Sequence, residues 1–201
     1  MKVLNLSLKN FRNIEETFLS ADEGMNVICG ENAQGKTNII EAIWLFTGAK
    51  SFRNSKDKEL VNFENEKAVI SLDFISEGIE KQAKLEIEEK RRAVLNENKL
   101  KSPSLLAGNF NAIIFSPNDL SIVKDGPSVR RRFLDIAIGQ LYPSYIEILK
   151  NYLRAVSQRN KIIKDLKYDS TLSVMLDIFE EEIAENGEKL INFRKKYIDE
   201  L

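Results

Sequence analysis

The sequence predicts an α/β fold, in which a lobe with a mixed β-sheet and a phosphate-binding loop precedes an α-helical second lobe. The loop is indicated by residues 30–37, which satisfy the pattern G-x-x-x-x-G-K-[ST]. Short alternating segments in the first hundred residues are typical of antiparallel hairpins. Beyond residue 126, apolar residues recur at helical spacing instead. We therefore expect two lobes, residues 1–125 with the loop and residues 126–201 with helices.

The strands of the first lobe are predicted from alternating or continuous apolar runs. Leu4, Leu6 and Leu8 alternate with polar residues, which is typical of a half-buried strand. The run 24–29 is short and mostly apolar, and it predicts a buried strand leading directly into the loop. Further strands are expected at residues 14–19, 68–75, 83–88, 91–95, 98–100 and 111–115, with turns at 77–78 and 96–97.

One helix is expected directly after the loop, over residues 38–46, with Gly48 placed to stop it. The polar segment 50–59 that follows is expected to be a loop near the bound nucleotide. Two helices of the second lobe are expected to start at prolines, because proline suits the first helical turn. The helices of this lobe are expected to begin at Pro127, at Pro143 and at Asp169–Ser170.

The residue types of the phosphate-binding loop, a Walker A motif, explain what it binds. Gly30 and Gly35 let the backbone wrap around a phosphate without clashes from a Cβ atom, so that successive N–H groups can point at the anion. Lys36 adds a positive charge against the β- and γ-phosphates of ATP, and the Thr37 hydroxyl can coordinate Mg²⁺. The following helix directs its N-terminus at the same phosphates.

The composition excludes several other kinds of site. The chain has 201 residues and a net charge of -1, so any basic surface for nucleic acid must be local. There is no histidine, and Cys29 is the only cysteine, which excludes an intramolecular disulfide and a cysteine zinc cluster. We expect Cys29 to be an apolar residue at a strand end. No apolar run has the length of a membrane span or a signal peptide, so the cytoplasm is the expected compartment and no membrane partner is expected.

A nucleotide hydrolase with this loop normally has a second acidic motif, an apolar strand that ends in an aspartate and holds Mg²⁺. Asp73 lies inside an alternating strand, and Asp135 and Asp177 lie in helical patterns, so none of them fits. We assign no catalytic residue in this chain. We expect the sequence to be truncated, with the missing motif beyond Leu201, and we expect the chain alone to hydrolyse ATP poorly or not at all.

Several further motifs are more specific than the loop alone, and on them the chain resembles the RecF family. This is a family of bacterial recombination and replication-repair ATPases related to SMC and ABC-type ATPases. Asn118 departs from the family pattern, which usually has an acidic residue there. The motifs that carry the resemblance are residues 9–13, 30–38, 41–43, 51–53, 115–120, 130–135 and 158–160.

The resemblance implies an ABC-type ATPase head lobe followed by a helical second lobe. In a full-length family member, two heads sandwich ATP between the loop of one protomer and the signature motif of the other, and the signature motif would also lie beyond Leu201. ATP binding then drives homodimer formation on DNA, with weak, DNA-dependent ATPase activity. The family helps to load the recombinase at gapped DNA together with RecO and RecR, in DNA repair and the SOS response. The expected partner is duplex, gapped or single-stranded DNA, bound without sequence specificity.

The resemblance also assigns residues to roles. A loop that senses Mg²⁺ and water is expected to follow a central strand. Gln140 is an alternative sensor, although a position on a helix surface is preferred for it. Arg53 is expected to face nucleotide or DNA, unless it is only a solvated charge. The ATP-binding set is Arg12, Asn13, Gly30, Glu31, Asn32, Ala33, Gln34, Gly35, Lys36, Thr37 and Asn38, with Thr37 also on Mg²⁺. The sensor set is Ser116, Asn118 and Asp119, and the possible contacts with DNA or nucleotide are Arg53, Arg130, Arg131 and Arg132.

Two other classes of function remain open at this point. A phosphotransferase with the same loop, acting on a small molecule, would need a substrate pocket and a lid with arginines. A structural interaction module would use nucleotide only to stabilise its fold. The long helical half of the sequence, with its apolar seams, favours a second lobe over a lid.

Overall fold

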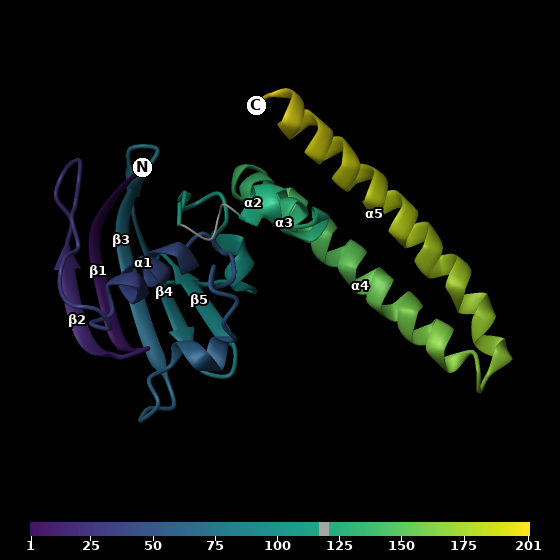
Figure 1. Cartoon of the computed structure of the whole chain (residues 1–201), viewed down its shortest axis with the longest axis horizontal. Helices are drawn as coiled ribbons and strands as arrows, with labels where there is room; N and C mark the ends of the chain where they lie inside the picture. Colours follow the sequence, from purple (N-terminus) through teal and green to yellow (C-terminus); the bar gives the residue numbers. More distant parts are fainter. Residues whose placement is uncertain (117–120) are drawn as a thin grey trace. The chain divides into compact units, whose positions relative to one another are not determined.

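The computed structural model describes residues 1–116 and 121–201, and the chain divides into two compact units (Figure 1). The units are Met1–Asp119 and Leu120–Leu201, and each is described by itself. The first contains the sheet and the phosphate-binding loop, and the second is helical. The boundary between residues 125 and 126 that the sequence suggested stays a prediction.

The first unit is built on one six-stranded sheet in the order β2-β1-β3-β4-β5-β6, and every neighbouring pair in it is antiparallel. Two features explain why the sequence forms this sheet: alternating apolar residues and two-residue turns. The strands are β1 (Lys2–Phe11), β2 (Ile14–Ser20), β3 (Ala68–Ser76), β4 (Ile79–Ile87), β5 (Arg91–Leu95) and β6 (Asn98–Lys99), and the short helical turns are η1 (Asp57–Leu60) and η2 (Pro103–Leu106).

The two expected hairpin turns are confirmed. Glu77 and Gly78 have φ values of 55° and 78°, and they connect the paired residues Ser76 and Ile79. Residues 96–97 have φ values of 45° and 65° between paired strand ends. Positive φ at both central positions is the geometry that matches the right-handed twist of the flanking strands.

The core of this unit lies between the sheet and helix α1 (Lys36–Leu45). Residues of β3 alternate between buried and half-buried, as the sequence pattern predicts for a strand with one face on a core. Ile70 and Leu72 of the sheet and Ala42 and Leu45 of α1 are completely buried in one cluster. The helix is therefore fixed against the sheet by apolar packing (Figure 1). Its first two residues, Lys36 and Thr37, are the last two of the phosphate-binding loop.

Two strands that the sequence predicted are not formed, and these predictions are wrong. Residues 24–29 contain no strand, and Met25 is 88% exposed. Residues 111–115 contain none either, and Phe115 is 85% exposed. Cys29 is likewise exposed rather than packed at a strand end.

The reason is that a strand needs a neighbour to hydrogen-bond with its backbone. None of the six strands found in residues 1–116 pairs with 24–29 or 111–115. In the first segment the Asn26 side chain instead bonds the backbone of Asp22, accepting at 2.9 Å and donating at 3.1 Å. Such local bonds compete with a sheet ladder. The sequence predicted a mixed sheet. The described residues form its antiparallel pairs.

The second unit is a set of helices dominated by one long antiparallel pair, α4 and α5 (Figure 1). Helices α3 and α4 begin at prolines, as predicted. Asp169 caps a short turn, η4, by accepting a hydrogen bond of 2.9 Å from the Thr171 N–H, so the last α-helix begins four residues later than expected. The elements are α2 (Ser121–Lys124), α3 (Pro127–Leu141), α4 (Pro143–Asp165), η4 (Ser170–Ser173) and α5 (Val174–Asp199).

A partly buried polar cluster ties three of these helices together. Tyr145 of α4 is completely buried and donates a short hydrogen bond to Asp135 of α3. Arg194 of α5 binds both groups, with its Nη2 at 2.7 Å from Asp135 Oδ1 and its Nε at 3.0 Å from the Tyr145 hydroxyl. Burial raises the pKa of the Tyr145 hydroxyl above its usual range, and the bond to Asp135 raises it further.

This cluster predicts a loss of stability in alkali. Since the unfolded chain deprotonates its tyrosines near pH 10 while folded Tyr145 keeps its proton, the stabilisation is complete below pH 10 and declines above it. We expect a loss of about 1 kcal/mol between pH 10 and 11 that is absent from Tyr145→Phe. Thermal unfolding of both proteins at several pH values measures this difference. Tyr168→Phe is the control, because Tyr168 is 91% exposed. Identical alkaline slopes for wild type and Tyr145→Phe would contradict the assignment.

Within the described ranges, no helix combines the length and the apolar character that a membrane crossing requires. Those residues also contain no cluster of three or more histidine, cysteine, aspartate or glutamate side chains arranged to hold a metal ion.

Candidate nucleotide-binding site

The phosphate-binding loop follows the irregular segment 24–29, and its last two residues, Lys36 and Thr37, begin α1. Three of its residues have positive φ: Gly30 at 145°, Ala33 at 66° and Gly35 at 94°. A Cβ atom on Gly30 would meet nothing within 4 Å, which leaves open space beside the backbone. Gly35 is different, because its Cβ would lie 3.0 Å from Asn13 Oδ1 and 3.2 Å from Ile14 Cγ1. The second glycine is therefore required both by its backbone conformation and by the close approach of Asn13.

Lys36 folds back over the loop that precedes it. Its ammonium group donates hydrogen bonds to the carbonyl oxygens of Gly30 at 2.7 Å and Glu31 at 2.6 Å. These two carbonyls lie at the start of the loop, whereas Lys36 lies at its end. The lysine thus links the two ends of the loop and places a positive charge beside its backbone, where a phosphate group needs one.

The N-terminus of α1 is suited to an anion. Gly35 is its N-cap residue, and neither a side-chain cap nor an acidic residue occupies the first turn. A helix N-terminus carries partial positive charge on N–H groups that lack an intrahelical partner. Thr37 is exposed in this first turn, and its hydroxyl is the hard oxygen donor that Mg²⁺ prefers. The residues present therefore fit a triphosphate with its magnesium ion.

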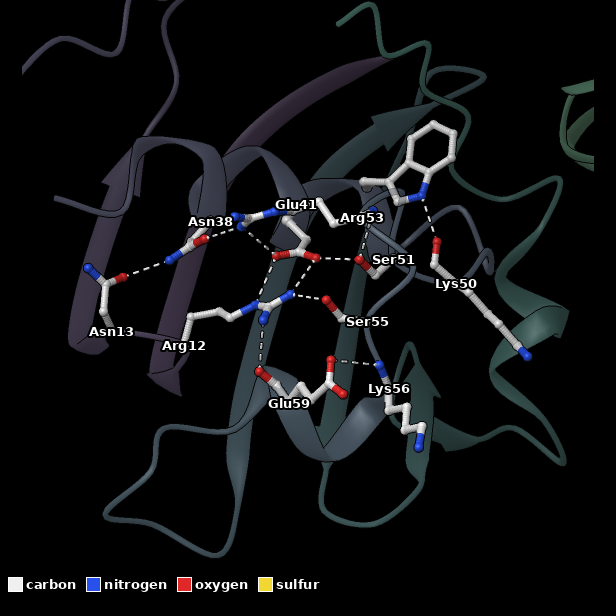
Figure 2. A network of polar contacts seen from close by, with 11 residues as sticks. Arg12, Asn13, Asn38, Glu41, Lys50, Ser51, Arg53, Ser55, Lys56 and Glu59 are labelled. Atoms are coloured by element: carbon white, nitrogen blue, oxygen red, sulfur yellow. Dashed lines mark hydrogen bonds and ion pairs between the residues drawn. The ribbon is translucent and has the colours of Figure 1, made fainter. Parts of the chain in front are cut away.

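Behind the loop, a buried carboxylate organises the neighbouring side chains (Figure 2). Glu41 of α1 has a completely buried side chain. Arg12, in the turn between β1 and β2, grips it as a fork, with Nη2 at 2.9 Å from Oε1 and Nε at 3.1 Å from Oε2. Ser51 donates a short hydrogen bond to the same carboxylate. Such a bidentate, charge-assisted pair is among the strongest polar contacts in proteins.

Arg53 connects this carboxylate to the loop side of the helix. One of its nitrogens, Nη1, lies 3.6 Å from Glu41 Oε2 and donates to Asn38 Oδ1 at 2.8 Å. Asn38 in turn donates to Asn13 Oδ1 at 2.7 Å, and Asn13 donates to the Ala33 carbonyl at 2.8 Å. The side chains predicted at Asn13, Asn38 and Arg53 are thus brought together, and their bonds reach the loop backbone.

The other predicted residues do not join this set of contacts. The guanidinium of Arg12 is directed at Glu41 and the 55–59 segment, so its expected contact with nucleotide stays a prediction. Ser116 lies in an irregular segment, and Asn118 and Asp119 lie outside the described residues. Helix α3 of the second unit carries Gln140, which is half-buried, and three exposed arginines: Arg130, Arg131 and Arg132. Glu31, Asn32, Ala33 and Gln34 are exposed in the loop.

The sequence reasoning assigned no role to Glu41, Ser51 or Ser55, although they hold the arginines in place. A signal was available for the first of them. Glu41 is the one acidic residue in the helix Lys36–Leu45, which is otherwise mostly apolar. A charge on the buried face of a helix must be paired, and arginines occur before and after the loop.

Comparisons with known proteins agree with this geometry. The family model described as AAA ATPase domain matches residues 1–200. The DNA replication and repair protein RecF of Acetivibrio thermocellus is 40% identical over 203 residues, which cover 100% of this chain and 55% of that protein. The corresponding protein of Halothermothrix orenii is 38% identical over 206 residues, covering 100% of this chain and 54% of that protein. The chain spans about half the length of these curated relatives.

Solved structures give the same result. The recombination mediator protein RecF-ATP, in the RecFOR pathway, is 36% identical with a TM-score of 0.93, over 98% of this chain and 54% of that one. An Smc head domain with an extended coiled coil from Pyrococcus furiosus is 18% identical, with a TM-score of 0.52 over 97% of this chain and 59% of that one. The second likeness concerns the fold alone, and together they confirm the expected ATPase head lobe with its helical extension.

Proposed function

Because this chain belongs to the AAA ATPase domain family and is a homologue of RecF, we propose that it binds ATP and acts in DNA replication and repair. The single observation that carries the proposal is the closed loop at the start of α1. There the Lys36 ammonium lies 2.7 Å from the Gly30 carbonyl, beside an uncapped helix N-terminus. Two sources of positive charge, the Lys36 ammonium and the N-terminus of α1, thus lie beside one short loop, which is the arrangement that binds polyphosphates.

Individual residues have distinct tasks in this proposal. Lys36 binds the β- and γ-phosphates, and the loop N–H groups bind the same phosphates. Thr37 holds Mg²⁺, which when bound supplies positive charge against the phosphate oxygens. Side chains of the loop and its flanks surround the nucleotide: Glu31, Asn32, Ala33, Gln34 and Asn38. Support for nucleotide binding comes from the relative named RecF-ATP, whose fold matches over 98% of the chain.

We extend the proposal to the partners of the whole protein. Arg53 and the exposed arginines of α3, Arg130, Arg131 and Arg132, are candidates for contacts with DNA phosphates. Since these contacts would carry no base information, the binding is expected to be independent of sequence and strongly weakened by salt. The proposal also includes ATP-dependent pairing of two heads and cooperation with RecR and RecO. It further includes loading of the recombinase at gaps and a role in the SOS response. We place this activity in the cytoplasm, with weak ATP hydrolysis.

DNA retention in a gel tests this proposal. The protein is mixed with duplex, gapped or single-stranded DNA, in the presence of Mg²⁺ with ATP, a non-hydrolysable analogue or no nucleotide. We expect retention that requires nucleotide and is equal for unrelated DNA sequences. The affinity for DNA should fall by about 10³-fold between 50 and 200 mM salt if six phosphates are contacted. Failure to retain any DNA under all nucleotide conditions would refute the DNA-binding part. Turnover stimulated by a small-molecule phosphate acceptor would instead indicate a phosphotransferase.

A further inference from the structure

We infer that Glu41 is a positioning residue for the nucleotide site, acting through Arg53 and two asparagine amides on the Ala33 carbonyl of the phosphate-binding loop. The inference rests on the proposed binding of nucleotide to this loop. Glu41 lies beyond the first turn of α1, and the contacts found for its carboxylate are with Arg12, Ser51 and Arg53, none of which belongs to the loop. Its effect on the loop must be carried by the side chains between the two (Figure 2).

The first step is the anchoring of Glu41. Its side chain is completely buried, and its carboxylate accepts bonds from Arg12 and Ser51. Arg12 is itself held in place, because its Nη1 donates to the Glu59 carbonyl at 2.9 Å and its Nη2 donates to Ser55 Oγ at 2.6 Å. The Arg12 backbone N–H also donates to the Leu60 carbonyl at 2.9 Å. The carboxylate is therefore fixed by Arg12 and Ser51, and Arg12 is fixed in turn by the 55–60 segment.

The second step is the placement of Arg53. Its side chain is 45% exposed, so packing alone does not define its position. Two contacts do so: Glu41 Oε2 at 3.6 Å and Asn38 Oδ1 at 2.8 Å, both made by Nη1. Without the carboxylate, the long side chain would retain only the bond to Asn38 and would gain many rotamers in solvent. Glu41 thus holds the arginine over the first turn of α1.

The third step follows from the polarity of hydrogen bonds. A guanidinium can only donate, so Asn38 must present its oxygen to Arg53 and its NH₂ group to Asn13. Asn13 then presents its oxygen to Asn38 and its NH₂ group to Ala33, whose carbonyl can only accept. We call these four groups, Arg53, Asn38, Asn13 and the Ala33 carbonyl, the amide relay. An arginine at one end and a carbonyl at the other fix the orientation of both amides.

The fourth step concerns the loop. Ala33 has a φ of 66°, a conformation that a non-glycine residue adopts only when its surroundings hold it there. Asn13 supplies such a hold, through its bond to the Ala33 carbonyl and its close approach to Gly35. A loop fixed before the nucleotide arrives binds more tightly, because less conformational entropy is lost on binding. Glu41 therefore contributes to ATP affinity without touching ATP.

A double-mutant cycle on ATP affinity tests the relay. Arg53→Met and Asn13→Ala remove side chains that do not contact each other but lie on the same relay. By calorimetric titration with ATP and Mg²⁺ we expect each single variant to lose about 3- to 10-fold in affinity. The double variant should lose no more than the weaker-binding single variant, because the second change cuts a relay that is already broken.

Glu41→Gln provides the second arm, because it keeps the shape of the side chain while removing its charge. We expect it to lower ATP affinity in the wild-type background and to change it less than twofold in the Asn13→Ala background. Should Glu41→Gln fail to fold, the cycle of Arg53→Met with Asn13→Ala still tests the relay through which Glu41 must act, and multiplying losses there refute the inference. Arg92→Met is the control arginine, because Arg92 is 70% exposed on β5 and pairs only with Glu88 among the described contacts.

The outcomes separate the relay from the proposed function. If the losses of Arg53→Met and Asn13→Ala multiply, each acts on the nucleotide independently and the relay is refuted, while nucleotide binding stands. If wild type binds no ATP, the proposed function and the relay are both refuted. A merely structural role of Glu41 would shift the melting temperature but would change the ATP affinity equally in both backgrounds.

Discussion

Lys36→Met is expected to lower the affinity of this protein for ATP by about 100- to 1,000-fold. Two unit charges 4 Å apart interact by about 4 kcal/mol at the effective dielectric constant of a protein surface, and 1.4 kcal/mol corresponds to a factor of ten. Lys36 is also the residue that closes the loop, through its bonds to the Gly30 and Glu31 carbonyls. The variant therefore loses both a direct partner of the phosphates and part of the loop's order before binding.

The measurement is calorimetric titration of wild type and variant with ATP and Mg²⁺. Lys101→Met is a matched control, because Lys101 is an exposed lysine of the same unit far along the chain from the loop. We expect this control to bind ATP as wild type does. Methionine at position 36 should leave the fold intact, since the lysine side chain is only partly buried and its bonds are to backbone carbonyls. An unchanged ATP affinity in Lys36→Met would remove the basis of the proposed site.

The loop and its helix were predictable from the sequence because their signals are local. The glycine spacing, the lysine and the apolar periodicity of residues 38–46 all lie within one short segment. The tight turns at 77–78 and 96–97 were predictable for the same reason, as a two-residue turn between strands is also a local feature.

The expected strands at 24–29 and 111–115 are not formed, because an apolar pattern alone does not specify a strand's partner. An apolar run indicates that a segment is suited to a sheet, but a strand exists only where another strand hydrogen-bonds to it. The sequence pattern contains no information about that partner. In the described part of the chain these segments stay outside the six-stranded sheet, with Ile113 and Phe115 exposed.

In the candidate site, too, local features were predictable and contacts between distant residues were not. The roles of Gly35 and Lys36 were predicted from their spacing in the loop motif. The role of Glu41 depends on contacts with Arg12, 29 positions before it, and Ser51, 10 positions after it. The family resemblance assigned Arg12 to the nucleotide, and that contact stays a prediction; what the structure adds is that its guanidinium binds the Glu41 carboxylate. Which arginine meets which acid depends on how β1, α1 and the 51–55 segment pack, and no local pattern encodes that packing.

Arg12→Met is expected to destabilise the first unit by about 3 kcal/mol. Removing one partner of a buried ion pair leaves an uncompensated charge, which costs more than the pair itself contributed. Glu41 is completely buried, and after the change only Ser51 and the more distant Arg53 remain beside it. Urea unfolding followed by the fluorescence of Trp44 measures the effect, because Trp44 is the only tryptophan of the chain and lies in the first unit.

A second substitution shows whether the buried charge is the cause. Arg12→Met combined with Glu41→Leu removes both charges and fills the space with apolar atoms, so we expect it to regain at least about half of the lost stability. The control Arg92→Met breaks an exposed pair with Glu88 and should change stability by less than about 0.5 kcal/mol. If the double variant is less stable than Arg12→Met, the loss comes from the other bonds of Arg12, to Ser55 and to the Glu59 carbonyl. In that case the arginine is required by the 55–59 segment and not by the carboxylate of Glu41.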